Sequence, residues 1–215
     1  MDKGGLQRGI RETSEKNTEE KVQEKIMNQF NISEKFKFQW IAPERTGSRK
    51  VAEVLSFFGF HNDGVPVYSF NNYSYTHQVQ FSEKYKDYQI ICNARNPYAK
   101  TLGICRSVVG LEYVKANKET FKKFVFEELR KGKRLDMVQR PLMNKKIDYI
   151  IRLENIFEDL KKIPFITEKF TSEQIQSLVL HGKEPLNWEE FYDQETKDAV
   201  YRYTSHLFDM WGYEK

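Results

Sequence analysis

The chain is poor in cysteine, with two in 215 residues, and neither Cys92 nor Cys105 has the CxxC or Cys/His spacing typical of zinc sites. Two isolated cysteines exclude a disulfide framework and predict buried thiols in a reducing, cytoplasmic setting. The chain also lacks a run of about 20 apolar residues, and no basic stretch followed by an apolar one stands at its start. We therefore expect a soluble protein without a secretion signal, a membrane partner or a metal site.

Excess charge of one sign is scarce as well, because the net charge is only +4. That value is too small for a dedicated nucleic-acid binder, so no nucleic-acid partner is expected. A modest positive charge still suits a small anionic ligand. The chain is 39% hydrophobic and 14% aromatic, enough for the core of one ordinary domain. Nothing in the composition predicts an oligomeric state.

The composition changes abruptly at Phe36 and divides the chain into two parts. Residues 1–35 are rich in both acidic and basic side chains, contain few aromatic ones, and include the helical charge pattern "EEKVQEKIMNQF". This pattern is typical of a charged arm or helix at the periphery of a protein. Residues 36–215 have the aromatic and apolar content expected of a single folded domain.

Strands and helices alternate along that domain. Three apolar runs predict strands, "FKFQWIA", "DYQIICNA" and "IDYIIRL". A helical pattern follows each one: the first ends at Gly59, the second has Pro97 in its first turn, and the third stops at Pro164. Alternation of this kind predicts an α/β fold with a parallel sheet flanked by helices. The last third of the chain, including "DQETKDAVYRYTSHLFDMWGY", predicts helices only.

The loop after the first strand reads "PERTGSR" and leads directly into a helix. Ligands of open parallel sheets bind beyond the carboxyl ends of the strands, where such a loop directs its free amide groups. Gly47 allows close approach of the backbone, Ser48 adds a hydroxyl, and Arg45 adds a charge with several donors. The loop therefore predicts an anion site, although a plain turn with a solvated arginine has the same pattern. It does not match GxxxxGK[ST], the loop of nucleoside-triphosphate enzymes.

A second basic motif, "RNPYAK", follows the second strand. Arg95 stands at the end of the strand and Lys100 lies one turn into the next helix. Together the two loops resemble the PAPS-dependent sulfotransferase family, whose donor is 3′-phosphoadenosine 5′-phosphosulfate. Residues 45–48 are similar to its motif P-[KR]-x-G-[ST]-[ST], and residues 95–100 are similar to R-[DN]-P-x-x-[RK]-x-x-S. The aromatic loop and last helix, closing on Gly-Tyr, also resemble that family, so the similarity spans residues 36–215.

The resemblance implies a P-loop-like fold and a donor bound without metal. The first motif would hold the 5′-phosphosulfate and the second the 3′-phosphate. The resemblance assigns ten residues to the donor site: Arg45, Thr46, Gly47, Ser48, Arg49, Arg95, Lys100, Ser107, Lys183 and Trp188. Of these, Trp188 would stack on the adenine, and Lys183 is placed by the resemblance alone. Trp188 has a second interpretation, as an anchor for the last helices.

Three positions depart from the family pattern. Glu44 is inserted after the proline, Arg49 stands where a second hydroxyl residue is common, and Gly103 occupies the usual serine position. In the family that serine helps to hold the 3′-phosphate. Either Ser107 replaces it, or the phosphate depends on Arg95 and backbone donors.

Sulfuryl transfer places negative charge on the leaving phosphate, which Arg45 would stabilise. A general base must also take the proton of the acceptor hydroxyl. His77, in "SYTHQVQF", resembles the family's base, His61 is the second choice, and Asp63 or Glu83 are carboxylate alternatives. The acceptor is expected to be a carbohydrate or a small alcohol or phenol, selected by loops 60–85 and 130–146.

Three other classes of protein remain open at this point. A basic RNA- or DNA-binding protein would show a basic stripe with interleaved exposed aromatic residues, whereas the aromatic residues of this sequence are expected to be buried. An inactive nucleotide-binding or scaffolding module would keep Arg45 and Arg95 but tolerate loss of His77. A P-loop-like nucleotide kinase would need a Walker-type lysine and carboxylates for magnesium, which the sequence does not show.

Overall fold

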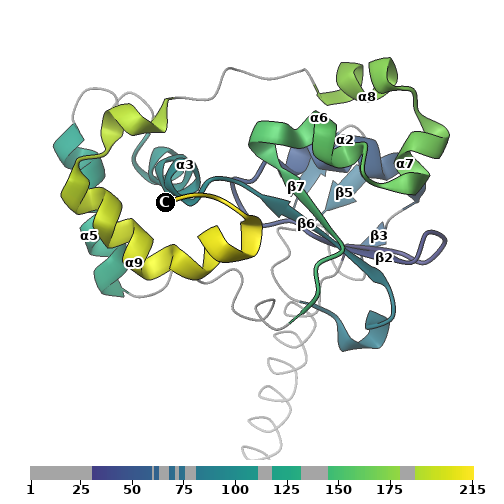
Figure 1. Ribbon diagram of the computed structural model, residues 1–215, viewed down its shortest axis with the longest axis horizontal. Helices are drawn as coiled ribbons and strands as arrows, with labels where there is room; N and C mark the ends of the chain where they lie inside the picture. Colours follow the sequence, from purple (N-terminus) through teal and green to yellow (C-terminus); the bar gives the residue numbers. More distant parts are fainter. Residues whose placement is uncertain are drawn as a thin grey trace, which may run out of the picture.

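The structure, a computed structural model, describes residues 31–59, 61–62, 68–70, 73–75, 81–110, 118–131, 145–179 and 187–215. In this part of the chain a five-stranded sheet has the strand order β3-β1-β2-β6-β7 (Figure 1). Its strands are β1 (Asn31–Ser33), β2 (Phe38–Ile41), β3 (His61–Asn62), β6 (Gln89–Ala94) and β7 (Tyr149–Arg152). A separate antiparallel pair consists of β4 (Tyr68–Phe70) and β5 (Tyr73–Tyr75).

Strands β2, β6 and β7 are parallel, as the alternation of strands and helices predicts. Trp40 of β2 lies opposite Ile91 of β6, and Ile91 lies opposite Tyr149 of β7. All four residues of β2 are buried. Three of them are apolar or aromatic, and the polar one, Gln39, donates hydrogen bonds to the carbonyls of Ser82 and Tyr85. The predicted α/β class is confirmed, and the predicted parallel pairing is found for β2, β6 and β7.

On the other side of β2, the strands β1 and β3 are antiparallel to their neighbours, and the sequence did not predict them. Strand β1 pairs antiparallel with both β2 and β3. Its residues fall within the segment assigned from the sequence to the N-terminal arm, yet all three are buried. Asn31 donates to the carbonyl of Trp40 at 3.3 Å, and Ser33 donates to the carbonyl of Phe58 at 2.8 Å. These hydrogen bonds satisfy the two polar side chains, which explains how they can be buried in the sheet. The rest of the predicted arm, residues 1–30, lies outside the described residues.

One face of the sheet is covered by four short helices, which Figure 1 shows together beside β7 and β6. They are α2 (Ser48–Leu55), α6 (Ile156–Leu160), α7 (Pro164–Lys169) and α8 (Ser172–Val179). The core on this side contains Phe38, Trp40 and Ile91 from the strands, with Val51 and Leu55 from α2. The helix after β7 ends before Pro164, as predicted. The proline then begins α7, where its missing N–H costs no hydrogen bond.

On the opposite face, α9 (Gln194–Trp211) packs on the strands through its last turns. Two further longer helices, α3 (Pro97–Val109) and α5 (Lys118–Lys131), pack against α9 (Figure 1). Met210 of α9 packs near Cys92, and Trp211 packs on Ala94, both of β6. Cys92 and Cys105 are free and buried, and burial raises the pKa of each thiol to about 12. The prediction of buried thiols is therefore confirmed. No helix within the described ranges is long and apolar enough to cross a membrane.

Candidate functional site

The carboxyl ends of β2, β6 and β7 meet at one edge of the sheet. Arg95, directly after β6, donates from Nη1 to the carbonyl oxygen of Arg45 at 3.2 Å. Asn93 donates to the carbonyl of Thr46 at 3.4 Å. Gly47 lies so close to Leu153, after β7, that a Cβ at residue 47 would be 2.5 Å from its Cδ1. The structure thus brings the two motif arginines to the same edge, which we call the arginine edge.

The loop from Pro43 to Gly47 has an unusual backbone. Arg45 has φ 64° and Gly47 has φ 81°, and Gly47 is the residue before the first turn of α2. No side chain caps this end of α2, and no acidic residue lies in its first turn. The positive end of the helix dipole therefore lacks a carboxylate from its own first turn, and an anion at the loop would be stabilised there.

The hydroxyl groups of Thr46 in this loop and of Ser48, the first residue of α2, both turn inward. Thr46 donates from Oγ1 to the carbonyl of Pro43 at 2.6 Å, and Ser48 donates from Oγ to the same oxygen at 3.2 Å. Both residues are buried. Both hydroxyls therefore stabilise the loop by donating to its own backbone. The sequence instead predicts them as hydrogen-bond donors to the ligand. Arg49, in the first turn of α2, is exposed.

Arg95 lies among several charged groups. Burial lowers the pKa of its guanidinium, Glu154 opposes that effect, and the positive charges of Arg106 and Arg45 lower it further. Helix α3 passes close by because residue 103 is glycine: a Cβ there would be 3.0 Å from Nη1 of Arg95 and 3.5 Å from Cβ of Arg45. Arg106 was missed from the sequence, since it lies outside both motifs.

Lys100 and Ser107 both lie in α3, where the sequence places them, but the side chain of Lys100 is buried and the hydroxyl of Ser107 is used within the helix. Lys100 is only 2% exposed, and its Nζ is 5.9 Å from the centre of the Trp211 ring. A phosphate in solution does not reach Lys100 in this arrangement. Ser107 is exposed, but its hydroxyl donates to the carbonyl of Ile104 in its own helix at 2.7 Å.

Trp188 packs against α3. Its ring is stacked on that of Tyr98, with centres 4.9 Å apart and planes at 24°, and Nζ of Lys197 lies 5.3 Å from it. These contacts match the interpretation of Trp188 as an anchor for the last helices rather than as an adenine platform.

The candidate bases are not gathered at the arginine edge. His77, Asp63 and the donor candidate Lys183 lie outside the described residues. His61 stands in β3, with β1 between it and β2. Glu83 precedes β6 and forms a 2.7 Å ion pair with Lys145, which precedes β7. This ion pair lies at the amino ends of the strands, opposite to the arginine edge.

The end of α9 is bound to the arginine edge through residues that the motifs did not include. Tyr213 donates to Oε2 of Glu154 at 2.5 Å, and Oε1 of Glu154 accepts the amide of Asn96 at 3.0 Å. Nε of Arg152 donates to the carbonyl of Trp211 at 2.9 Å. Burial and the Glu154 carboxylate raise the pKa of Tyr213 well above its usual value, so its hydroxyl stays a neutral donor. The similarity of the Gly-Tyr ending to the sulfotransferases was the one sequence signal for this contact.

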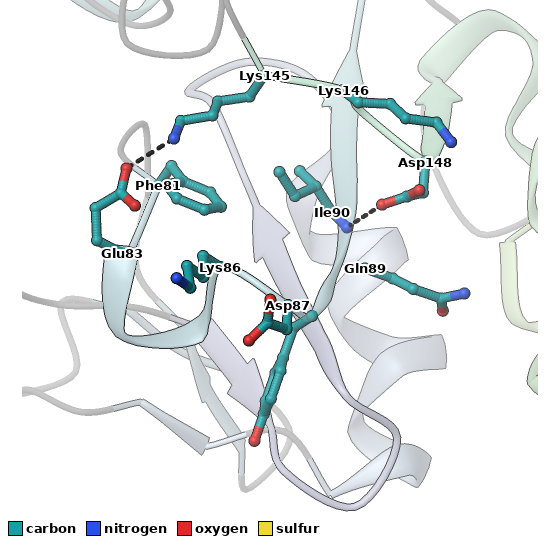
Figure 2. A pocket seen from close by; sticks show the side chains of 10 residues that line it. Phe81, Glu83, Lys86, Asp87, Gln89, Ile90, Lys145, Lys146 and Asp148 are labelled. Carbon is teal, nitrogen blue, oxygen red and sulfur yellow. Dashed lines mark hydrogen bonds and ion pairs between the residues drawn. The ribbon is translucent and has the colours of Figure 1, made fainter.

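A pocket of about 420 Å³ lies at the amino ends of β6 and β7, away from the arginine edge (Figure 2). Phe81 and Ile90 contribute apolar surface, and Asp148 accepts the amide of Ile90 at 2.8 Å. Its charged lining has both signs: Glu83, Asp87 and Asp148 with Lys86, Lys145 and Lys146. The length of β6 separates this pocket from Arg95, so it is not part of the arginine edge.

The arginine edge therefore offers three guanidinium groups, the uncapped start of α2 and the carboxylate of Glu154. Among the residues the structure describes, no group of three His, Cys, Asp or Glu side chains is placed to hold a metal ion. Comparison with known proteins gives no match: no family model fits the chain, and no curated protein and no solved structure is significantly similar to it.

Proposed function

We propose that the chain is a sulfotransferase that moves a sulfuryl group from PAPS to a hydroxyl of a carbohydrate or a small alcohol or phenol. The observation that supports this function most directly is the contact between the two motif arginines, with Arg95 donating to the Arg45 carbonyl at 3.2 Å. The motifs are 50 residues apart in sequence and resemble the two halves of one donor site. Their meeting at one sheet edge is what such a site requires.

The charges of this edge favour a ligand with several negative charges. Arg45 is 43% exposed, and its one ion pair with the described residues is a 3.4 Å contact with its neighbour Glu44. An exposed pair of this kind contributes little. Arg95 is close enough to Arg45 and Arg106 for their charges to lower its pKa. Guanidinium groups brought together repel each other, and an anion between them offsets that repulsion with charge-assisted hydrogen bonds.

PAPS supplies an activated sulfuryl group, whose transfer forms a sulfur–oxygen bond at the acceptor and breaks the one to the 5′-phosphate. Arg45 stabilises the charge that develops on the leaving phosphate, and as an arginine it stays protonated throughout. His77 takes the proton of the acceptor hydroxyl in this scheme. The P-loop-like architecture of the sulfotransferases belongs to the same proposal. It is supported by the order of elements at the arginine edge, where β2 is followed by a loop with Gly47 and then by α2.

An inactive nucleotide-binding module is the second candidate. The observations that favour it are the buried Lys100 and the inward hydroxyls of Thr46 and Ser48, since each removes a predicted ligand contact. Such a module would bind the same nucleotide through Arg45 and Arg95 without transferring sulfate.

The experiment that tests the function uses PAPS labelled with radioactive sulfur and a panel of sugar, phenol, alcohol and tyrosyl-peptide acceptors. We expect label transfer in the presence of EDTA, and its loss in His77→Ala with unchanged nucleotide affinity. Binding of the nucleotide without transfer to any acceptor would favour the inactive module. Magnesium-dependent phosphoryl transfer from ATP would favour a nucleotide kinase instead.

A further inference from the structure

The face of α3 that passes the arginine edge has no side chain at its point of closest approach. That point is Gly103, where a Cβ would lie 3.0 Å from Nη1 of Arg95 and 3.5 Å from Cβ of Arg45. Contacts of 3.0 Å between a Cβ and another heavy atom are too close for ordinary packing, so a side chain at residue 103 would displace a guanidinium. The glycine therefore lets α3 pack directly against the guanidinium of Arg95.

Arg106 lies on the same face of the helix, because residues three positions apart are neighbours on a helix surface. It is half-buried, and its positive charge acts on Arg95. In the described part of the chain no ion pair or hydrogen bond of the Arg106 side chain is found. Arg106 and Arg95 thus approach each other from α3 and from the end of β6.

The carboxylate whose charge acts on Arg95, that of Glu154, is already engaged. Glu154 accepts a hydrogen bond on each oxygen, from Tyr213 at 2.5 Å and from the amide of Asn96 at 3.0 Å. Ser107, the residue predicted to replace the missing serine, also uses its hydroxyl, which donates to the carbonyl of Ile104. Outside the two motifs, Arg106 is a group on this face of α3 whose donors are not used within the described chain.

We propose that Arg106 takes over the role of the motif serine, which is glycine at residue 103, and binds the 3′-phosphate of the nucleotide together with Arg95. This assignment rests on the proposed function. A 3′-phosphate carries close to two negative charges at neutral pH, and two guanidinium groups match that charge with several donors in fixed directions. Gly103 lets α3 pack directly against Arg95, so that Arg106, one turn further along the helix, lies beside it.

The test compares the affinities of adenosine 3′,5′-bisphosphate and AMP by calorimetry in the wild type and in Arg106→Ala. We expect the bisphosphate to bind about 10-fold or more weakly to the variant, while AMP affinity stays within about 2-fold because AMP lacks the 3′-phosphate. Arg202→Ala, on the exposed surface of α9, is the matched control for loss of one positive charge. It should change neither affinity by more than about 2-fold at physiological salt.

Two further variants keep the test decisive if Arg106→Ala folds poorly. Arg106→Lys keeps the charge and should retain a measurable preference for the bisphosphate over AMP. Gly103→Ser restores the residue of the sulfotransferase motif, yet we expect it to weaken the bisphosphate because its Cβ crowds Arg95. A wild type that prefers the bisphosphate, with Arg106→Ala keeping the same preference, overturns this inference and leaves the proposed function intact. A wild type without any preference overturns both.

Discussion

The hydroxyl of Tyr213 donates a 2.5 Å hydrogen bond to Oε2 of Glu154, whose other oxygen accepts the amide of Asn96 at 3.0 Å. Two loops far apart in sequence are joined by this one carboxylate. Glu154 follows β7, Asn96 follows β6, and Tyr213 follows α9. The end of the last helix is therefore attached to the turn that carries Arg95.

Replacement of Tyr213 by phenylalanine removes this hydrogen bond but keeps the ring. We expect the free energy of unfolding to fall by about 1 kcal/mol, since the bond involves a charged acceptor that is partly exposed. Affinity for adenosine 3′,5′-bisphosphate should fall about 3-fold, because the turn carrying Arg95 becomes less ordered. Urea unfolding and calorimetry measure the two effects. Tyr201→Phe, within α9, is the control, and equal effects of both substitutions would contradict the role given to Tyr213.

Gly47→Ala tests the tight approach of the first loop to β7. Alanine at φ 81° is strained, and its Cβ would be 2.5 Å from Cδ1 of Leu153. We expect a loss of about 2–4 kcal/mol in the free energy of unfolding, from left-handed backbone strain plus overpacking. Gly59 provides a matched control, because it has φ 62° but a Cβ at this residue would meet nothing within 4 Å. Gly59→Ala should cost only about 1–2 kcal/mol, and an equal cost at both sites would show that Leu153 does not restrict the loop.

Arg45→Ala tests the electrostatic role of the first motif. If Arg45 acts on charge that develops during transfer, turnover should fall by about 10²–10³-fold while nucleotide affinity falls less. Arg45→Lys should retain part of the activity, since the charge remains but the planar set of donors is lost. Steady-state kinetics with PAPS separates the two effects. Equal losses in affinity and in kcat/KM, with kcat unchanged, would assign Arg45 to ground-state binding alone.

Asp193 gives the fold a dependence on acid pH. Hydrogen bonds from Thr196 and Lys122 lower the pKa of Asp193 from 3.8 to about 2. A carboxylate with a lowered pKa stabilises the fold fully above its ordinary pKa, and that contribution is lost as pH falls through about 2. Thermal unfolding between pH 5 and pH 2 should therefore show a smaller decline for Asp193→Asn than for the wild type. Parallel declines would exclude Asp193 as a source of the pH dependence.

The central strands were predictable because β2, β6 and β7 are apolar runs followed by helical patterns. Strand β1 was not, because Asn31 and Ser33 look like surface residues in the sequence. Their side chains bond to the carbonyls of Trp40 and Phe58, contacts that exist only once the chain has folded. A polar side chain in a buried strand depends on partners 9 and 25 residues away, which no local pattern records.

At the candidate site, too, local patterns were predictable and contacts formed by folding were not. The meeting of Arg45 and Arg95 followed from their positions at the ends of parallel strands. The orientation of the helical residues did not follow from spacing, because it depends on how α3 packs. That packing turns Lys100 toward Trp211 and brings Arg106 to the arginine edge.

Calorimetry of the wild type with adenosine 3′,5′-bisphosphate and with AMP, both in EDTA, tests the central claim most directly. The claim is that the arginine edge binds a nucleotide through two separate anionic groups. The bisphosphate should bind at least about 10-fold more tightly than AMP, because each lost charge-assisted contact to the 3′-phosphate costs about 1.5–3 kcal/mol. Equal affinity for the two nucleotides, or no binding of either, would contradict the assignment of Arg45 and Arg95 to a sulfotransferase donor site.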